Sequence, residues 1–491
     1  MPEIRPFLSR TMMICLCVAI ASLSGCGGSG PGGTPVPPPP ITGPYSNATF
    51  TGLYAFVFSG KDSAGFFGVA GNFQANGAGA LTSGLMDINS GTGVSTSVPF
   101  TGTYSILANG QGTATLNSTV RNFSLRFIVI SPGHARIASF DNSAGGNGDL
   151  IAFLPTPAFN LAGTFGFNLA GIDAAASPLL TLGAFTGDGL GNVTAGVQDI
   201  SDNGTISAKQ AVTGTYTLPV NGRGTFTLTT ALGVLHFAYY VSGPFNLMMV
   251  ETERGPALAG ETFPGQAVPN VTTPGCLGCV YALSGLSSGQ PLAEAGIFQL
   301  GTAGTVSGIS ADDNRAGVAG HPSLGGGVIA FDPAFRGTMS MGARNFAVYP
   351  SSQGVFMMQI DAGQIIAGVA INQGQIGSPN LDLSFNGNYA FYSSGMPLVM
   401  TTNEVGQVTA SNPPSGTVSG HMDMIANGVP APGLPFTGTF VTDKLARGTV
   451  TLQTSTGAQH LVVYTTGGAG PMTFVGTDSN FVVSGRFEMQ Q

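Results

Sequence analysis

The feature that most constrains the fold of this chain is an internal repeat of about 110 residues that occurs four times. A Gly-Thr pair marks each copy, beginning at Gly112, Gly224, Gly337 and Gly448, with successive offsets of 112, 113 and 111 residues. Each copy also opens with a short segment of small and aromatic residues, at 52–56, 163–167, 280–283 and 387–391. Such constant spacing predicts one structural unit repeated four times in tandem.

The repeated segments carry the residue pattern of β-strands. Threonine alternates with Phe226 and Leu228 within 224–230, and alternating apolar side chains in 122–129 share one face. Period-two alternation with β-branched and aromatic residues is typical of a strand that is buried on one side. Asparagine or aspartate followed by glycine separates the segments, as type I′ hairpin turns require. Because no sustained helical period appears after residue 44, the sequence predicts an all-β protein.

The second copy indicates how many strands one unit contains. Eight segments have strand character, at 163–169, 180–186, 193–200, 210–218, 224–230, 234–241, 245–252 and 257–263. Eight strands joined by short turns predict an antiparallel meander, which closes into a small barrel when its first and last strands pair. This architecture resembles calycins and avidins in general shape only. Two alternatives stay open: a sandwich of two stacked sheets per unit, or a propeller whose blades are half-units.

The amino-terminal segment has the character of a bacterial export signal. Arg5 and Arg10 precede an apolar run at 12–23, which is too short to span a bilayer as a stable helix. The sequence Leu-Ser-Gly-Cys at 23–26 resembles the lipobox of bacterial lipoproteins. This resemblance implies that Cys26 is the first residue of the mature protein and carries lipid. The alternative is an ordinary secretory signal in which Cys26 is incidental.

The residues after Cys26 suit a tethered protein. A glycine-rich stretch and a proline-rich spacer at 31–44 follow it, and a polyproline II segment extends about 3.1 Å per residue. In lipoproteins an aspartate after the cysteine favours the inner membrane, so by resemblance Gly27 points to the outer membrane. The predicted organisation is a signal peptide at 1–25, a linker at 26–45, and β-units at 46–155, 156–264, 265–373 and 374–491.

Composition excludes one large class of function. Only 8% of the residues are charged, and the formal net charge is -8. Nucleic-acid binding needs clustered basic residues, which a chain of this composition lacks. The 43% of hydrophobic residues also argues against a disordered chain.

Two cysteines remain once the signal peptide and Cys26 are set aside. Cys276 and Cys279 form a Cys-x-x-Cys pair, which in an exported protein predicts a local disulfide. Free thiols and a metal or redox site are the alternatives, but no second cysteine pair and no helix accompany the motif. No paired ligand spacing is found among the five histidines, so no metal and no cofactor are expected: His134, His236, His321, His421 and His460.

Two other groups of residues have both a structural and a functional interpretation. Arginine precedes the Gly-Thr pair in three copies, as Arg223, Arg336 and Arg447. We favour a structural role at the turn, and the alternative is one ligand contact per unit. The adjacent carboxylates Asp312 and Asp313 suggest calcium, but a solvated loop is the expected setting for such a pair.

These observations favour a non-catalytic protein. No nucleophile, base and acid recur together across the units, so we do not expect an enzyme. The leading hypothesis is a lipid-anchored protein of the cell envelope with a binding or structural role. Its expected partners are the membrane, through the lipid, and an envelope protein or glycan. The alternative is that each barrel encloses a small apolar ligand, as calycins do, and the volume inside the barrels distinguishes the two.

Overall fold

The computed structural model describes residues 43–90, 93–141, 144–153, 161–243, 246–265, 278–332, 335–351, 354–372, 385–394, 402–411, 415–426, 428–442, 446–465 and 470–491. Cys26, Cys276 and the predicted signal peptide lie outside these residues. The helical elements of the described residues are two short 3₁₀ turns, η1 (Asn47–Thr49) and η2 (Thr302–Gly304). Within the same residues, no helix has the length and apolar character needed to cross a membrane.

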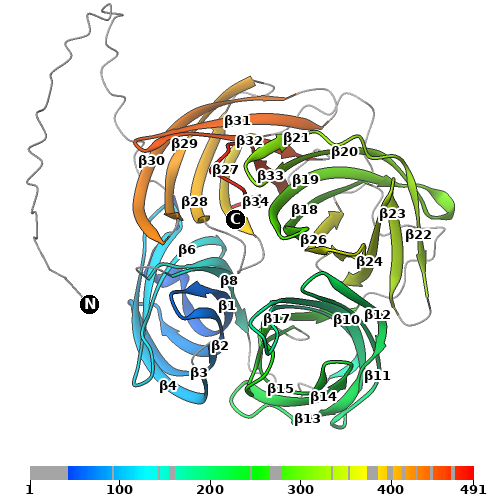
Figure 1. The fold of residues 1–491 in the computed structure, drawn as a ribbon. Helices are drawn as coiled ribbons and strands as arrows, with labels where there is room; N and C mark the ends of the chain where they lie inside the picture. Colours follow the sequence, from blue (N-terminus) through cyan, green and yellow to red (C-terminus); the bar gives the residue numbers. More distant parts are fainter. Residues whose placement is uncertain are drawn as a thin grey trace, which may run out of the picture. The chain divides into compact units, whose positions relative to one another are not determined.

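The first unit forms a closed barrel of eight antiparallel strands, called barrel 1 (Figure 1). Its strands are β1 (Thr51–Asp62), β2 (Gly65–Asn76), β3 (Ala80–Ser90), β4 (Gly93–Ile106), β5 (Gln111–Ser118), β6 (Phe123–Ser131), β7 (His134–Ser139) and β8 (Gly145–Phe153). Each strand pairs with the next, and β8 pairs with β1. Closure leaves no free edge at which another chain can add a strand.

The second unit forms barrel 2, which closes through the β9–β17 and β10–β11 pairings. Its strands are β9 (Ala162–Ile172), β10 (Pro178–Asp188), β11 (Asn192–Asp202), β12 (Thr205–Ala211), β13 (Thr213–Tyr216), β14 (Arg223–Thr230), β15 (Gly233–Val241), β16 (Leu247–Glu251) and β17 (Ala257–Pro264). The predicted strand at 210–218 contains β13 and the last two residues of β12, which begins earlier than predicted, and both strands pair with β11. All eight predicted strands are therefore present, and the prediction of a barrel is confirmed.

The third and fourth units repeat this topology. Barrel 3 contains β18 (Gly278–Ser287), β19 (Gln290–Leu300), β20 (Thr305–Arg315), β21 (Val318–Gly320), β22 (Gly327–Phe331), β23 (Gly337–Met341), β24 (Arg344–Ser351), β25 (Gly354–Gln359) and β26 (Gln364–Asn372). Barrel 4 contains β27 (Gly387–Ser394), β28 (Thr402–Ser411), β29 (Ser415–Ala426), β30 (Val429–Thr442), β31 (Arg447–Thr454), β32 (Gly457–Tyr464), β33 (Met472–Gly476) and β34 (Ser484–Met489). The protein is thus all-β, with four closed barrels in tandem.

Aromatic side chains fill the interior of barrel 1. Phe56, Phe73, Phe100 and Phe127 all point into it and are at most 5% exposed. The space left among the side chains is about 20 Å³, which has room for about one water molecule. The interiors of the other barrels hold comparable clusters of buried aromatic and aliphatic residues.

The glycine of the Gly-Thr landmark has a packing role. Gly112 lies opposite Phe127 in the β5–β6 register, and a Cβ atom at Gly112 would lie 2.1 Å from the phenyl ring. In barrel 2, a Cβ atom at Gly224 would lie 2.3 Å from the ring of Tyr239. In the first two copies the glycine therefore lies where an inward-pointing ring on the next strand crosses the backbone, whereas Val348 and Val463 face Gly337 and Gly448.

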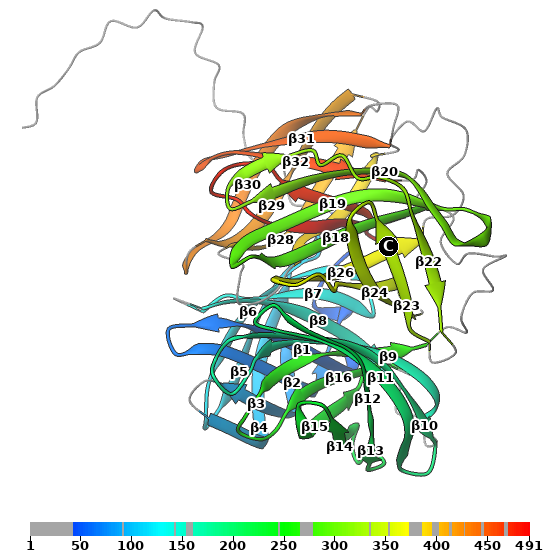
Figure 2. The same cartoon turned by 45° about the vertical axis from the view of Figure 1, so that its right-hand side comes forward.

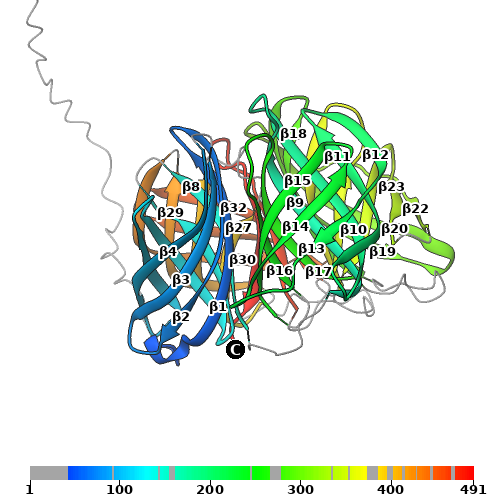
Figure 3. The ribbon, with the colours of Figure 1, turned by 90° about the horizontal axis from the view of Figure 1, so that it is seen from below.

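Outward-facing apolar residues join each barrel to the next. The strands of the four barrels can be followed from two further directions in Figure 2 and Figure 3. The shared clusters lie between barrels 1 and 2 (including Phe66 and Tyr240), 2 and 3 (Phe263 and Phe356), 3 and 4 (Val280 and Tyr464), and 4 and 1 (Ile130 and Tyr392). The contacts between the barrels therefore run in a closed cycle.

Candidate functional site

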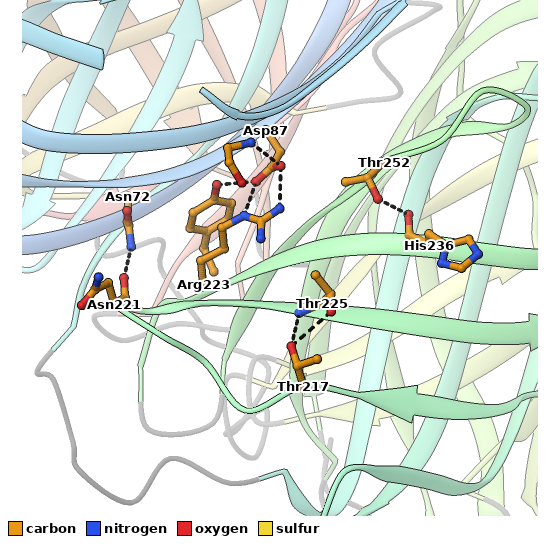
Figure 4. A network of polar contacts seen from close by, with 10 residues as sticks. Asn72, Asp87, Thr217, Asn221, Arg223, Thr225, His236 and Thr252 are labelled. Atoms are coloured by element: carbon orange, nitrogen blue, oxygen red, sulfur yellow. Dashed lines mark hydrogen bonds and ion pairs between the residues drawn. The ribbon is translucent and has the colours of Figure 1, made fainter. Parts of the chain in front are cut away.

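The arginine before the Gly-Thr pair contacts the preceding barrel. Arg223, at the start of β14, forms a two-point ion pair with Asp87 in β3 (Figure 4). Its Nε lies 2.8 Å from Oδ2, and its Nη2 lies 2.8 Å from Oδ1. Asp87 is completely buried, and its Oδ1 also accepts the backbone N–H of Ser97 at 2.9 Å. This planar geometry makes the contact both strong and directional.

A tyrosine completes the contact. Tyr240 lies opposite Arg223 in the β14–β15 register and donates its hydroxyl to Asp87. Burial and the charge of Asp87 raise the pKa of Tyr240 well above its ordinary value, so the phenol stays a neutral donor. The hydrogen bond from Arg223 to Asp87 raises the pKa of the guanidinium as well. We call this set an Arg-Asp-Tyr bracket, in which the arginine and tyrosine belong to one barrel and the aspartate to the preceding barrel.

Two more brackets join the following barrels. They consist of Arg336, Asp199 and Tyr349 between barrels 3 and 2, and of Arg447, Asp312 and Tyr464 between barrels 4 and 3. The predicted site residues Arg223, Arg336 and Arg447 therefore do not meet at one place. Each of them directs its guanidinium to an aspartate of the neighbouring barrel. The contact therefore joins two barrels, whereas the predicted structural role was at the turn within one unit.

The sequence did not reveal the role of the bracket aspartates, of which Asp312 alone was considered, as a possible calcium ligand. Asp312 and Asp313 belong to strand β20 and are 4% and 7% exposed, so the expectation of a solvated loop is wrong. A usable signal was present, because Asp87, Asp199, Asp312 and Asp423 are separated by the same 112, 113 and 111 residues as the Gly-Thr pairs.

The interface between barrels 4 and 1 lacks a complete bracket. Gln111 stands in the place of the arginine, and Ile128 lies opposite it in the place of the tyrosine. Gln111 donates to Asp423 through Nε2 at 3.4 Å, and Arg126 Nε lies 3.8 Å from the same carboxylate. At this interface the bracket position therefore holds a weaker polar contact, and the ion pair between Arg136 and Glu488 joins the same two barrels elsewhere.

Side-chain amides add further contacts between barrels. Asn72 donates to the carbonyl of Asn221 at 2.8 Å, across the interface of barrels 1 and 2 (Figure 4). Two residues after the bracket aspartate, Asn89 donates to the carbonyl of Glu251 at 3.0 Å. Asn314, at the equivalent position of barrel 3, donates to the carbonyl of Gly476 at 2.9 Å. In each contact, a side-chain amide of one barrel donates to a backbone carbonyl of the next barrel.

A cavity of about 410 Å³ lies where the four barrels meet. Outward-facing residues of the first and last strand of every barrel line it. The cross-strand pairs at its wall are Val57 and Asp149, Asn168 and Glu261, Ser284 and Ala367, and Tyr392 and Arg486. These pairs occupy equivalent positions of the repeat, because the first member of each directly follows the opening segment that marks the unit. The repeat therefore brings one outward-facing pair from every barrel to a common centre.

A charged network forms one wall of the cavity. His134 Nε2 lies 2.8 Å from Asp149 Oδ1, and Arg136 Nη1 contacts Asp149 Oδ2. Arg136 Nη2 lies 3.2 Å from Glu488 Oε1, and its guanidinium carbon lies 4.4 Å from the ring centre of Tyr392. Burial opposes ionisation of Asp149, but Arg136 and His134 outweigh it and lower its pKa to about 2. Asp149 is therefore an ionised carboxylate whose two oxygens are both engaged.

Three other polar groups lie on the wall, and two of them contain an atom without a partner. Burial and the neighbouring charge of Asp149 raise the pKa of Glu261 well above its ordinary value, and its carboxyl group shares a hydrogen bond with Asp149. Arg486 Nε and Asn168 Oδ1 are buried and have no hydrogen-bond partner among the described residues. A buried polar atom without a partner costs free energy, so this wall favours a molecule that supplies one.

The remaining predicted site residues are only partly described. Cys279 is completely buried at the start of β18 and is disulfide-bonded. Its predicted partner Cys276 and the predicted lipidation site Cys26 lie outside the described residues, so both assignments stay predictions. Across the described ranges, no group of three or more histidine, cysteine, aspartate or glutamate residues is arranged to hold a metal ion.

Comparison with known proteins adds little to this description. No protein-family model and no curated protein matches the chain. Among solved structures, it is similar to a crystal structure of the vaccine antigen Transferrin Binding Protein B, a double mutant from Haemophilus parasuis Hp5. The identity is 12%, the match covers 74% of this chain and 82% of that chain, and the TM-score is 0.18. A TM-score this low carries no argument about fold or function.

Proposed function

We propose that this protein is a lipid-anchored component of the bacterial cell envelope with a non-catalytic role, in which the four barrels act as one rigid binding body. The observation that carries the proposal is the Arg-Asp-Tyr bracket, which recurs at three successive interfaces. Barrels that moved independently would expose the bracket aspartates, which are at most 4% exposed. A buried ion pair fixes the register of two surfaces more than it stabilises them.

The alternative, a small apolar ligand inside each barrel, has less support. The phenylalanines inside barrel 1 leave only about 20 Å³, whereas small-molecule sites usually measure about 300–1,000 Å³. This cavity of barrel 1 is therefore too small for such a ligand, which favours binding outside the barrel interior.

An enzymatic role also has little support. The most strongly ionised carboxylate at the cavity, Asp149, is already hydrogen-bonded to both His134 and Arg136. A general base works best when its pKa lies near the operating pH, and a carboxylate whose pKa is lowered to about 2 is a weak base.

The anchor rests on the resemblance of residues 23–26 to a lipobox. Lipid on Cys26 and the proline-rich spacer at 31–44 would hold the barrels away from the outer membrane. From there they would meet envelope proteins or glycans, which are the partners expected for a surface with so few charges.

The test is expression of the full chain in a bacterium that processes lipoproteins, in parallel with a Cys26→Ser variant. We expect mass spectrometry to find an acylated Cys26 at the mature amino terminus, and the protein to fractionate with membranes. The Cys26→Ser protein is expected in the soluble fraction. A mature protein that begins at another residue and carries no lipid would remove the anchor from the proposal.

A further inference from the structure

The cavity between the barrels has the size and the composition of a ligand site. Apolar clusters and brackets close the interfaces elsewhere, whereas about 410 Å³ remains at the centre. This volume falls within the usual range of small-molecule sites, about 300–1,000 Å³. All four barrels contribute to the wall, so the cavity exists only in the assembled chain.

The wall has an apolar side and a polar side. Barrel 3 contributes Phe356 and Val369, and Phe263 of barrel 2 lies in the same cluster as these residues. At the equivalent last-strand position, barrel 3 carries Ala367, whereas the other barrels carry Asp149, Glu261 and Arg486. The short side chain of Ala367 therefore leaves space opposite a charged wall.

Divergence at this position contrasts with the constancy of the repeat elsewhere. The Gly-Thr landmark is kept in all four copies, and the bracket arginine is kept in three. The four residues at the centre instead differ in charge and size, and together they make a site without fourfold symmetry. Such a site suits one asymmetric molecule better than a symmetric packing contact.

Arg486 is the group that most clearly indicates the ligand. Its Nε is buried and has no hydrogen-bond partner among the described residues, and its charge interacts with Glu261 and Glu488 without a hydrogen bond to that Nε. The nearby acceptor Glu488 is already bound by Arg136 and Tyr392. A planar guanidinium with free donors matches a carboxylate in two-point geometry.

The acidic groups nearby do not prevent an anion from binding. Asp149 is paired with Arg136 and His134, and the carboxyl group of Glu261 shares a hydrogen bond with it, so both acidic groups already have partners within the wall. The free Oδ1 of Asn168 accepts a hydrogen bond from a hydroxyl or amino group.

We propose that this cavity binds a small organic carboxylate, with the carboxylate on Arg486, a hydroxyl or amino substituent on Asn168, and the hydrocarbon part against Phe263, Phe356 and Val369. The proposal deepens the binding role proposed above, and it rests on the four barrels forming one body. It does not depend on the lipid anchor.

The experiment measures mandelate binding to the full chain carrying Cys26→Ser, by isothermal titration calorimetry. Mandelate supplies a carboxylate, a hydroxyl and a phenyl ring, and its neutral amide mandelamide is the matched probe. We expect one mandelate per chain, and an affinity for mandelamide that is lower by roughly tenfold or more, since a hydrogen bond to a charged group contributes about 1.5–3 kcal/mol.

Two variants locate the site. Arg486→Gln removes the cation and is expected to weaken mandelate binding by roughly tenfold or more. Ala367→Leu fills the apolar side without changing any charge, and it is expected to abolish binding. Arg315→Gln is the control, because this arginine is 51% exposed and belongs to no wall of the cavity.

Three results would overturn the proposal. The first is no mandelate binding at about 10 mM, a concentration that saturates most specific sites. The others are equal affinity for mandelate and mandelamide, and unchanged mandelate binding in both Arg486→Gln and Ala367→Leu. Should Arg486→Gln fail to fold, Ala367→Leu decides alone. The protein in this experiment carries no lipid, so its outcome and that of the anchor test are independent.

Discussion

Arg336 and Asp199 form a two-point ion pair between two β-barrels, with side chains that are 2% and 0% exposed. Arg336 Nε lies 2.6 Å from Oδ2, Nη2 lies 2.7 Å from Oδ1, and the hydroxyl of Tyr349 lies 2.5 Å from Oδ2. Burial opposes the charge of Arg336, but the hydrogen bonds and charge of Asp199 outweigh it and raise the pKa of the guanidinium. Removal of one partner would leave a buried charge without compensation.

The first prediction concerns this pair. Arg336→Gln is expected to lower the free energy of unfolding by about 3–5 kcal/mol, because Asp199 would then be a buried carboxylate without its counter-ion. Urea unfolding of the full chain measures the change. The matched control is Arg315→Gln, whose guanidinium is 51% exposed and lies 3.7 Å from Asp313, and its expected cost is about 0–1 kcal/mol. Equal costs for the two variants would contradict a structural role for the bracket.

Local pattern was sufficient to predict the strands. Period-two alternation in 224–230 and 234–241 gave β14 and β15 to within one residue at each end. The Gly-Thr landmark was found by its spacing alone, and its cause, the ring of Phe127 that crosses Gly112, became visible only in the structure. Hairpin connections were enough to favour a barrel, because a meander of eight strands closes most simply upon itself.

Contacts between barrels were not predicted, because no local pattern encodes them. Arg223 and Asp87 are 136 residues apart, and the residues around an aspartate in a strand do not indicate which arginine it will pair with. The cavity was equally hidden, since Asp149, Glu261 and Arg486 share a position in the repeat but not a chemical type. Comparison of the copies position by position reveals the aspartates, whereas the cavity requires the arrangement of the barrels.

The second prediction completes the fourth bracket. The double variant Gln111→Arg with Ile128→Tyr places the missing arginine and tyrosine beside Asp423. In the natural protein Asp423 is 5% exposed and accepts a hydrogen bond from Gln111 at 3.4 Å. We expect the double variant to be more stable than the natural protein by roughly 1.5–3 kcal/mol, the usual contribution of a hydrogen bond to a charged group. Thermal unfolding gives the comparison.

The single variants are the controls for this design. Gln111→Arg alone is expected to gain less than the pair, because Asp423 would still lack its phenolic donor. A double variant less stable than either single variant would indicate that the phenol ring introduced by Ile128→Tyr cannot be accommodated against Tyr392 and Val405, which pack in the same cluster as Ile128.

The third prediction concerns barrel 1 in isolation. Residues 46–155 are expected to fold alone, because β8 pairs with β1 and the phenylalanine core lies inside the barrel. The fragment would expose apolar residues that now face barrel 2, including Phe66 and Phe153. We therefore expect a β-type circular dichroism spectrum, a cooperative melt, and a lower melting temperature than that of the full chain. A soluble but unfolded fragment, together with a two-barrel fragment that melts cooperatively, would show that one barrel depends on its neighbour.

The fourth prediction concerns pH. Glu404 in β28 is 2% exposed, and burial raises its pKa to about 7, although Gln459 donates a hydrogen bond to it at 2.7 Å. In the unfolded chain a glutamate titrates near pH 4.3. Between these two values the folded protein binds a proton that the unfolded chain does not, so the free energy of unfolding falls as the pH rises through this window.

Glu404→Gln removes this titration while it keeps an acceptor for Gln459. The variant is expected to be more stable than the natural protein by roughly 3–4 kcal/mol at pH 8, and by only about 1 kcal/mol at pH 5. Thermal melts at both pH values provide the measurement. Glu253→Gln is the control, because this glutamate is 58% exposed and its replacement should change stability little at either pH. A gain for Glu404→Gln that is the same at pH 5 and pH 8 would mean that packing, and not the buried charge, accounts for the effect.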